Sequence, residues 1–183
     1  MLMIDIMSSM KTPHILSFIL LLSFSIGLNA ADPNIPMKKA SVELDLIKSF
    51  AGTWEGTVDH GNGPEPVTIH YKITSGGSAV EETIFPGTPM EMITLYYDKG
   101  DKLGLTHYCM MQNRPEMKLS SSSENKIHLE FDPACGIDPK SEAHMNSLTI
   151  IVHGKNSMTH EWTFFENGEA QEISPFKLKR VDS

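Results

Sequence analysis

Apolar and polar residues alternate along most of the chain after Gly52. The run from Pro66 to Ser75 shows this most clearly, because its apolar residues share one face and Thr68, His70, Lys72 and Thr74 share the other. A period of two is typical of a strand with one buried face. The paired glycines after Ser75 tolerate the positive φ of a tight turn, so the next apolar run is expected to return as the antiparallel partner.

The same reasoning, applied to the whole chain, predicts about ten short strands joined by turns rich in Gly, Pro, Asn and Ser. They are expected at residues 54–60, 66–75, 79–85, 90–97, 102–110, 115–120, 126–131, 146–153, 157–165 and 173–181. An antiparallel meander leaves two unpaired edges unless it closes on itself, so we expect an up-and-down barrel. A β-sandwich is the alternative.

A helical period precedes these strands. Val42, Leu44, Leu46, Ile47 and Phe50 fall near helical spacing, Ser41 is a plausible N-cap, and Gly52 ends the pattern. A helix this short is marginal in isolation, so it must lie on an apolar surface. Residues 41–183 therefore form the expected single barrel domain, with the helix at one end.

The first 30 residues have the pattern of a secretory signal peptide. Lys11 precedes an apolar run over 15–28, and small residues follow at Ala30 and Ala31. The run is shorter than the roughly 20 apolar residues of a spanning helix, so we expect cleavage after Ala30 and no stable membrane span. Met10 is a more natural start than Met1. Residues 31–40 are expected to form a flexible lead-in, and the mature protein to be periplasmic or secreted.

Charge restricts the class of partner. The net charge is −8 over 183 residues, and the cluster of basic residues is confined to 177–180. A nucleic-acid partner is therefore not expected. Cys109 and Cys135 would lie in an oxidising compartment, where a disulfide between them is allowed. Two unpaired thiols are the equal alternative, and the oligomeric state is left open.

A short motif resembles the calycin group, which comprises lipocalins, fatty-acid-binding proteins and nitrobindins. It consists of Phe50, Gly52 and Trp54 after the helix, together with Arg180 on the last strand. The resemblance implies a barrel capped at one end by the helix, with Arg180 packed over Trp54. Strand parity agrees, since Arg180 shares a face with Phe176 and Leu178.

Longer segments resemble uncharacterised exported bacterial proteins of a domain-of-unknown-function family in or near that group. The matching segments are 74–80, 85–92, 106–109, 144–149 and 161–163. No activity comes with this resemblance. Gly52, Trp54 and Arg180 are therefore expected to be structural, and function has to be argued from the interior.

The interior faces of two strands carry groups that can contact a ligand. Leu103, Leu105, His107 and Cys109 share one face, as do Met158, His160, Trp162 and Phe164. The candidate ligand contacts are Trp54, Tyr97, His107, Cys109, His160 and Trp162. A mostly apolar cavity with a few polar groups is typical of small-molecule sites. The alternative is that both histidines are core residues bonded to their neighbours.

Catalytic and metal chemistry have weaker support. No tight metal-ligand spacing is present, so no metal site is expected. The resemblance to nitrobindin would imply haem, but no histidine lies near Arg180, so the axial ligand would be His107 or His160. No nucleophile elbow is present. Parity puts Glu81 and Glu82 on opposite faces of one strand, and an inward glutamate could be a general acid, but we expect these residues and Glu91 on a solvated exterior.

The leading hypothesis is an exported barrel that binds a small apolar molecule in its interior. An enzyme that uses an interior histidine as general acid or base is the second hypothesis. A structural envelope protein with a filled core is the third.

Overall fold

The computed structural model describes residues 38–59, 63–171 and 175–181. The proposed signal peptide and most of the lead-in lie outside these residues. Helix α1 (Val42–Lys48) is followed by strands β1 (Gly52–Asp59), β2 (Pro64–Thr74), β3 (Ala79–Ile84), β4 (Met92–Lys99), β5 (Lys102–Tyr108), β6 (Glu116–Ser123), β7 (Lys126–Phe131), β8 (His144–Gly154), β9 (Ser157–Glu166), β10 (Glu169–Gln171) and β11 (Phe176–Arg180). Short 3-10 turns η1 (Ser75–Gly77) and η2 (Pro133–Cys135) lie between strands.

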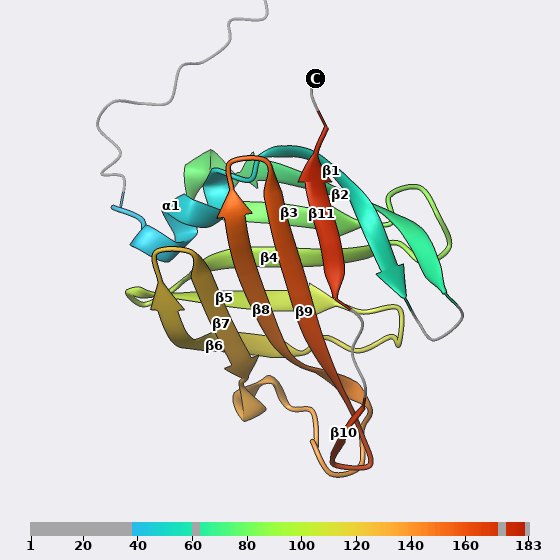
Figure 1. The fold of residues 1–183 in the computed structure, drawn as a ribbon. Coiled ribbons are helices and arrows are strands. Elements are labelled where there is room, and N and C mark those ends of the chain that lie inside the picture. The colour runs from blue at the N-terminus through green and yellow to red at the C-terminus, as the bar shows by residue number, and fades with distance from the viewer. Residues whose placement is uncertain (1–37, 60–62, 172–174, 182–183) are drawn as a thin grey trace, which may run out of the picture. The chain divides into compact units, whose positions relative to one another are not determined.

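The strands form one closed antiparallel barrel (Figure 1). The hydrogen-bonded order of the strands is β9, β11, β1, and then β2 to β8 in sequence order. Pairing of β8 with β9 closes the ring. Ten strands make up this ring, and β10 is a short addition that pairs only with the end of β9. The predicted all-β barrel is thus confirmed, while β10 was not expected from the sequence.

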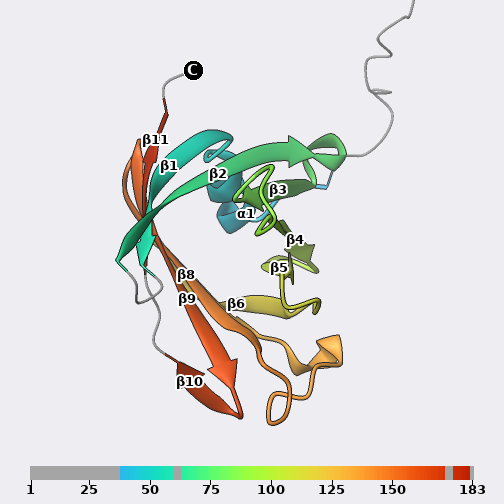
Figure 2. The same ribbon diagram turned by 90° about the vertical axis from the view of Figure 1, so that its right-hand side faces the viewer.

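Helix α1 caps one end of the barrel, as predicted. Ser41 is its N-cap and accepts a hydrogen bond from the Leu44 backbone N–H at 3.0 Å. Leu44 and Ile47 are buried in the core, and the helix contacts β2, β3, β4 and β5. Figure 2 shows α1 within the curve of these strands. Val42 does not belong to the buried stripe, because it is 78% exposed.

Contacts also fix the start of the helix to the barrel. Asp98, near the end of β4, accepts hydrogen bonds from the Ser41 backbone N–H at 2.8 Å and from the Ser41 hydroxyl at 2.6 Å. The Asp98 carboxylate thereby holds the N-cap residue Ser41 close to the β4–β5 turn. Such tertiary contacts are needed because a helix this short is marginal in isolation.

The two ends of the barrel differ in their connections. At the α1 end the hairpins turn within 75–78, 100–101, 124–125 and 155–156. At the other end the connections extend over 85–91, 109–115 and 132–143. Long loops on a rigid scaffold are where binding residues concentrate, so we call this second end the loop end.

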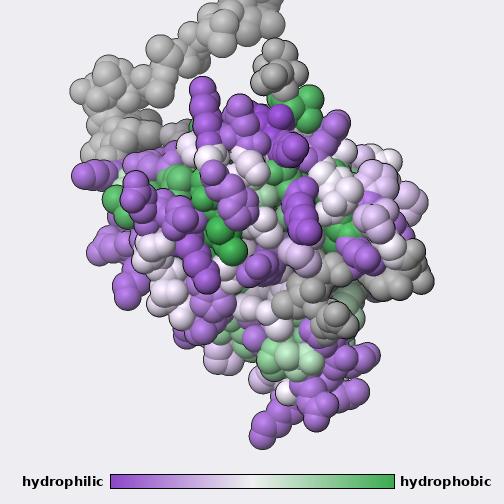
Figure 3. Space-filling view, in the orientation of Figure 1, coloured by the Kyte–Doolittle hydropathy of each residue, from purple (hydrophilic) through white to green (hydrophobic). Residues whose placement is uncertain are grey.

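The core fills the barrel, and the outside is mostly polar. Buried interior side chains include Trp54, Tyr96, Leu105, Leu129, Leu148 and Trp162. The face drawn in Figure 3 is largely hydrophilic, with apolar residues scattered between charged ones. This distribution is the one expected when the alternating face of each strand points inward.

Candidate functional site

A row of polar side chains crosses the interior wall of four consecutive strands. Tyr71 on β2 pairs with Glu82 on β3, Glu82 pairs with Thr94 on β4, and Thr94 pairs with His107 on β5. All four are buried. Because directly paired residues lie on the same face of a sheet, the register alone brings these four groups side by side.

Glu82 is the centre of this row. Its Oε1 accepts a hydrogen bond from the Tyr71 hydroxyl at 2.7 Å, and its Oε2 accepts one from the Tyr96 hydroxyl at 2.8 Å. Burial raises the pKa of the Glu82 carboxyl, while the bonds from Tyr71, Tyr96 and Thr94 act in the opposite direction. A buried carboxyl with this many donors is stabilised in place despite its desolvation.

The prediction that Glu82 lies on a solvated exterior is wrong, since its side chain is 0% exposed. Its inward direction could have been predicted from the sequence, because Glu82 shares its strand parity with the apolar residues Val80 and Ile84, which are buried. Glu81 faces the other side of β3, as its parity predicted. The roles of Tyr71 and Tyr96 were also missed, although a tyrosine on an apolar face needs a partner for its hydroxyl.

His160 reaches the same group from the opposite wall. Its Nε2 lies 3.1 Å from the Tyr71 hydroxyl, and its Nδ1 lies 3.4 Å from Glu82 Oε1. Burial lowers the pKa of His160 to about 3, so the imidazole is neutral. Because Tyr71 donates its proton to Glu82, the Tyr71 oxygen accepts the proton on His160 Nε2. His160 Nδ1 therefore has a lone pair facing the Glu82 carboxyl.

His107 and Trp162 are adjacent interior residues that each keep an unpartnered buried polar atom. Among the described residues, the other side chains with such an atom are Asn113, His144 and His160. The His107 Nδ1 lies 2.9 Å from the Thr94 hydroxyl oxygen, and burial lowers the pKa of His107 to about 4. The His107 and Trp162 rings are adjacent, with centroids 4.8 Å apart. Within the described residues, neither His107 Nε2 nor Trp162 Nε1 has a hydrogen-bond partner. Unpaired buried polar atoms are costly, so they mark a place where a further group can bind.

Trp54 lies elsewhere, at the α1 end, and its polar atom is already used. Its indole Nε1–H donates to the Phe50 carbonyl at 2.8 Å, and the Arg180 guanidinium lies 4.4 Å from the ring centroid. Arg180 also donates to the carbonyls of Ser49 and Ala51, both at 2.7 Å. The expected packing of Arg180 over Trp54 is therefore present, and Trp54 has no free polar group to offer a ligand.

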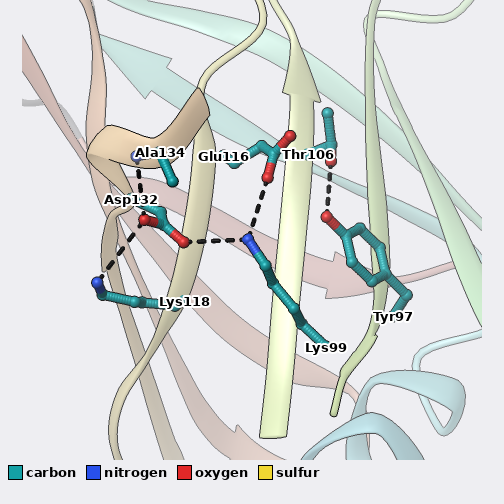
Figure 4. A network of polar contacts seen from close by, with 7 residues as sticks. All are labelled: Tyr97, Lys99, Thr106, Glu116, Lys118, Asp132 and Ala134. Atoms are coloured by element: carbon teal, nitrogen blue, oxygen red, sulfur yellow. Dashed lines mark hydrogen bonds and ion pairs between the residues drawn. The ribbon is translucent and has the colours of Figure 1, made fainter. Parts of the chain in front are cut away.

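Tyr97 does not face the interior. It alternates with the buried Tyr96 along β4, and its hydroxyl lies 3.0 Å from that of Thr106 on the outer face of β5. Figure 4 shows Tyr97 beside an outer polar network, in which Lys99 donates to Asp132 at 3.1 Å and to Glu116 at 3.4 Å. The placement of Tyr97 among the interior contacts is thus corrected by strand parity.

The two cysteines are not bonded to each other, which corrects the disulfide alternative. Cys109 follows the end of β5 and packs against the core, while Cys135 ends the turn η2 beside β6. A disulfide needs the two Cβ atoms close and directed toward one another. Burial against the core raises the pKa of the Cys109 thiol.

Metal and haem chemistry find no suitable ligand set in the part of the chain that the structure describes. There, no group of three or more His, Cys, Asp and Glu side chains could hold a metal ion. A haem also does not fit these residues. His160 is engaged with Tyr71 and Glu82, and the Trp162 ring occupies the space beside His107.

The loop end is lined by apolar side chains. Phe85, Cys109 and Met145 are partly buried and pack against the core. Large apolar residues of the adjoining loops are exposed, namely Met90, Tyr108, Met110 and Met111. The loops are joined where the Asn113 amide donates to the Ala143 carbonyl at 2.7 Å. Apolar side chains thus gather at the end of the barrel where β5 ends, one residue after His107.

A separate surface cleft of about 460 Å³ lies beside α1. It is lined by Leu46, Ser49, Phe50, Val152, Gly154, Lys155 and Arg180. The Arg180 guanidinium is already committed to backbone carbonyls there.

Comparison with known proteins adds no family to this description. No protein-family model matches the chain, and a search of curated proteins also gives no match. Function is therefore argued from the geometry of the barrel.

Proposed function

We propose that the protein is an exported, calycin-like barrel that binds a small, largely apolar molecule through its loop end. The observation that carries the proposal is the pair of unpartnered buried nitrogens, His107 Nε2 and Trp162 Nε1, on adjacent rings. Apolar side chains of the loop end pack against the same core. Small-molecule sites combine a mostly apolar lining with a few polar groups that fix orientation.

The ligand must displace side chains to reach this pair. Leu105, His107 and His160 have no exposed surface, so the unliganded interior is filled. Phe85, Cys109 and Met145 are partly exposed, and these are the side chains that would move. The stability recovered when the two nitrogens gain partners favours the liganded state.

Binding is favoured over catalysis by the environment of the histidines. A general base works best when its pKa is near the working pH, whereas burial lowers the pKa of His107 to about 4. Glu82 is engaged with two tyrosines and is not free to act on a ligand. His107 is consequently better suited to accept a hydrogen bond than to remove a proton.

Export is supported by the signal-peptide pattern of residues 1–30. Among the described residues, no helix is both long enough and apolar enough to cross a membrane. Export is tested by expressing the full chain in a bacterial host and determining the N-terminus of the protein recovered from the periplasm. Cleavage after Ala30 is expected, and an intact N-terminus in the cytoplasm would contradict it.

Binding is tested by native mass spectrometry of the protein purified from a periplasmic extract. A mass excess that disappears on denaturation is expected. Replacement of His107 by Phe should reduce the occupied fraction, while Tyr97→Phe, which alters only the outer face, should not. If neither the extract nor added apolar compounds give a mass excess, the filled-core structural role is favoured and the binding proposal fails.

A further inference from the structure

The surface cleft beside α1 combines apolar walls with an open volume. Helix α1 packs mainly on β2, β3, β4 and β5, and its other side borders the cleft near β8 and the β8–β9 turn (Figure 1). Leu46 and Phe50 line the cleft on the α1 side, and Val152 lines it on the β8 side. Its volume of about 460 Å³ is within the range of small-molecule sites.

Two cations, Lys155 and Arg180, line the same cleft, and its described lining includes no Asp or Glu. In the part of the chain that the structure describes, neither cation forms an ion pair with a carboxylate. Both carboxylates of α1, at Glu43 and Asp45, already have partners elsewhere. The cleft is therefore locally positive in a chain whose net charge is −8.

Arg180 keeps its charge although most of its N–H groups are used. It donates to the carbonyls of Ser49 and Ala51 at 2.7 Å, and to those of Phe50 and Lys155 at 3.5 Å. All four acceptors are uncharged, so the positive charge is not cancelled. A guanidinium has five N–H groups, so one remains for a further acceptor. The carbonyls after α1, which would repel an anion, are already paired with Arg180.

We infer that this cleft is a second binding site, outside the barrel interior, and that it takes an amphipathic anion. The apolar chain of the ligand lies against Leu46 and Val152. Its head group is an oxyanion that accepts hydrogen bonds from the Lys155 ammonium and from the remaining N–H of Arg180.

The head group is what distinguishes this ligand from other amphipathic molecules. An alcohol with the same chain makes the same apolar contacts but gains no charge-assisted hydrogen bond, which is roughly twice as strong as a neutral one. An alkylammonium ion would meet two cations and no acceptor of opposite charge. An inorganic anion would leave the apolar walls in contact with water.

The test compares probes that share one chain and differ in the head group: octyl sulfate, octanoate, octanol and octylammonium. Their affinities for the purified protein are measured by titration calorimetry at neutral pH, with each probe dissolved as monomer. Both anions are expected to bind about tenfold or more tightly than octanol, and octylammonium more weakly than octanol. Shortening octyl sulfate to hexyl sulfate should weaken binding by about fourfold for each CH₂ removed.

Variants locate the binding. Lys155 is exposed in a turn, and Lys155→Gln should weaken octyl sulfate about tenfold while leaving octanol unchanged. Lys177→Gln is the matched control, because it removes the same charge from the outer face of β11 and does not line the cleft. Leu46→Ala should weaken octyl sulfate and octanol alike, since both place a chain on that wall.

Three results would overturn the inference. Octanol could bind as tightly as octyl sulfate, or Lys177→Gln could cost as much affinity as Lys155→Gln, which would show general charge attraction. The protein could also bind vesicles that contain phosphatidylglycerol and yet bind no dissolved octyl sulfate, which would indicate attraction to an anionic surface. None of these results concerns the interior site of the proposed function, which is tested by its own ligand.

Discussion

Arg180 lies over the indole ring of Trp54, with its guanidinium carbon 4.4 Å from the ring centroid. The two residues are also directly paired in the register between β1 and β11. The last strand is thereby joined to the first by a cation–π contact, a strand ladder and the bonds from Arg180 to the carbonyls of Ser49 and Ala51. These contacts strengthen the junction of β1 and β11 at the α1 end.

Replacement of Arg180 by Ala should therefore destabilise the fold. The loss of charged hydrogen bonds and of the contact with Trp54 is expected to lower the free energy of unfolding by about 2–4 kcal/mol. Arg180→Lys should recover little, because an ammonium cannot reproduce the planar fork. Urea denaturation measures the effect, with the outward-facing Lys179→Ala as control. Equal midpoints for Arg180→Ala and Lys179→Ala would contradict this account.

Gly56 is the position on β1 where a side chain is least tolerated. A Cβ there would lie 1.9 Å from the Lys177 carbonyl oxygen on β11. Gly56→Ala should force the two strands apart and cost about 1–3 kcal/mol or more, measured by the shift in thermal midpoint. Gly104→Ala is the matched control, since its nearest atom would be 3.4 Å away. A larger loss for Gly104→Ala would show that the β1–β11 approach is not the constraint.

The Glu82 cluster should behave as a unit. Glu82→Leu leaves the buried hydroxyls of Tyr71 and Tyr96 without their acceptor, and we expect a loss of about 2–4 kcal/mol. Tyr96→Phe should cost about 1–3 kcal/mol in the wild type but almost nothing in the Glu82→Leu background, because the bond is already lost. A double-mutant cycle by urea denaturation measures this coupling. Additive losses would contradict the cluster.

Stability should fall as the pH is lowered from neutral. The pKa values of His107 and His160 are about 4 and about 3 in the fold, below the 6.5 of an unperturbed histidine. At a pH between the folded and the unperturbed pKa of each histidine, the unfolded chain binds a proton that the folded chain does not. The stabilising effect of the two neutral histidines is therefore complete above about pH 6.5 and is lost progressively toward about pH 4 for His107 and about pH 3 for His160.

Glu82 acts in the opposite direction, because burial raises its pKa and so favours the folded state at lower pH. We expect a net loss of about 1–2 kcal/mol between pH 6.5 and pH 5, measured by urea denaturation at each pH. His107→Gln should reduce the slope. A free energy of unfolding that increases as the pH is lowered from 6.5 to 5 would rule out neutral buried histidines.

The local elements and most of the inward faces follow from the amino-acid sequence alone. The alternation along 66–75 and the glycines at the following turn predicted the β2–β3 hairpin, and Ser41 marked the start of α1. Parity placed His107, His160 and Trp162 inside the barrel and Arg180 on the same face as Leu178. These features depend on residues close together in the chain, where backbone sterics and side-chain period leave a readable pattern.

Which interior groups meet depends on how the strands are paired in three dimensions. Register across β2–β5 joined Tyr71, Glu82, Thr94 and His107 in one row, and closure of the ring brought His160 against that row from the opposite wall. A one-residue shift in any strand would have turned its polar group outward. The inward face of Glu82 and the outward face of Tyr97 follow from strand parity, which is local. Register and closure are properties of distant segments, so the bonding partners of Glu82 and the absence of a bond between the two cysteines could not be read from the chain.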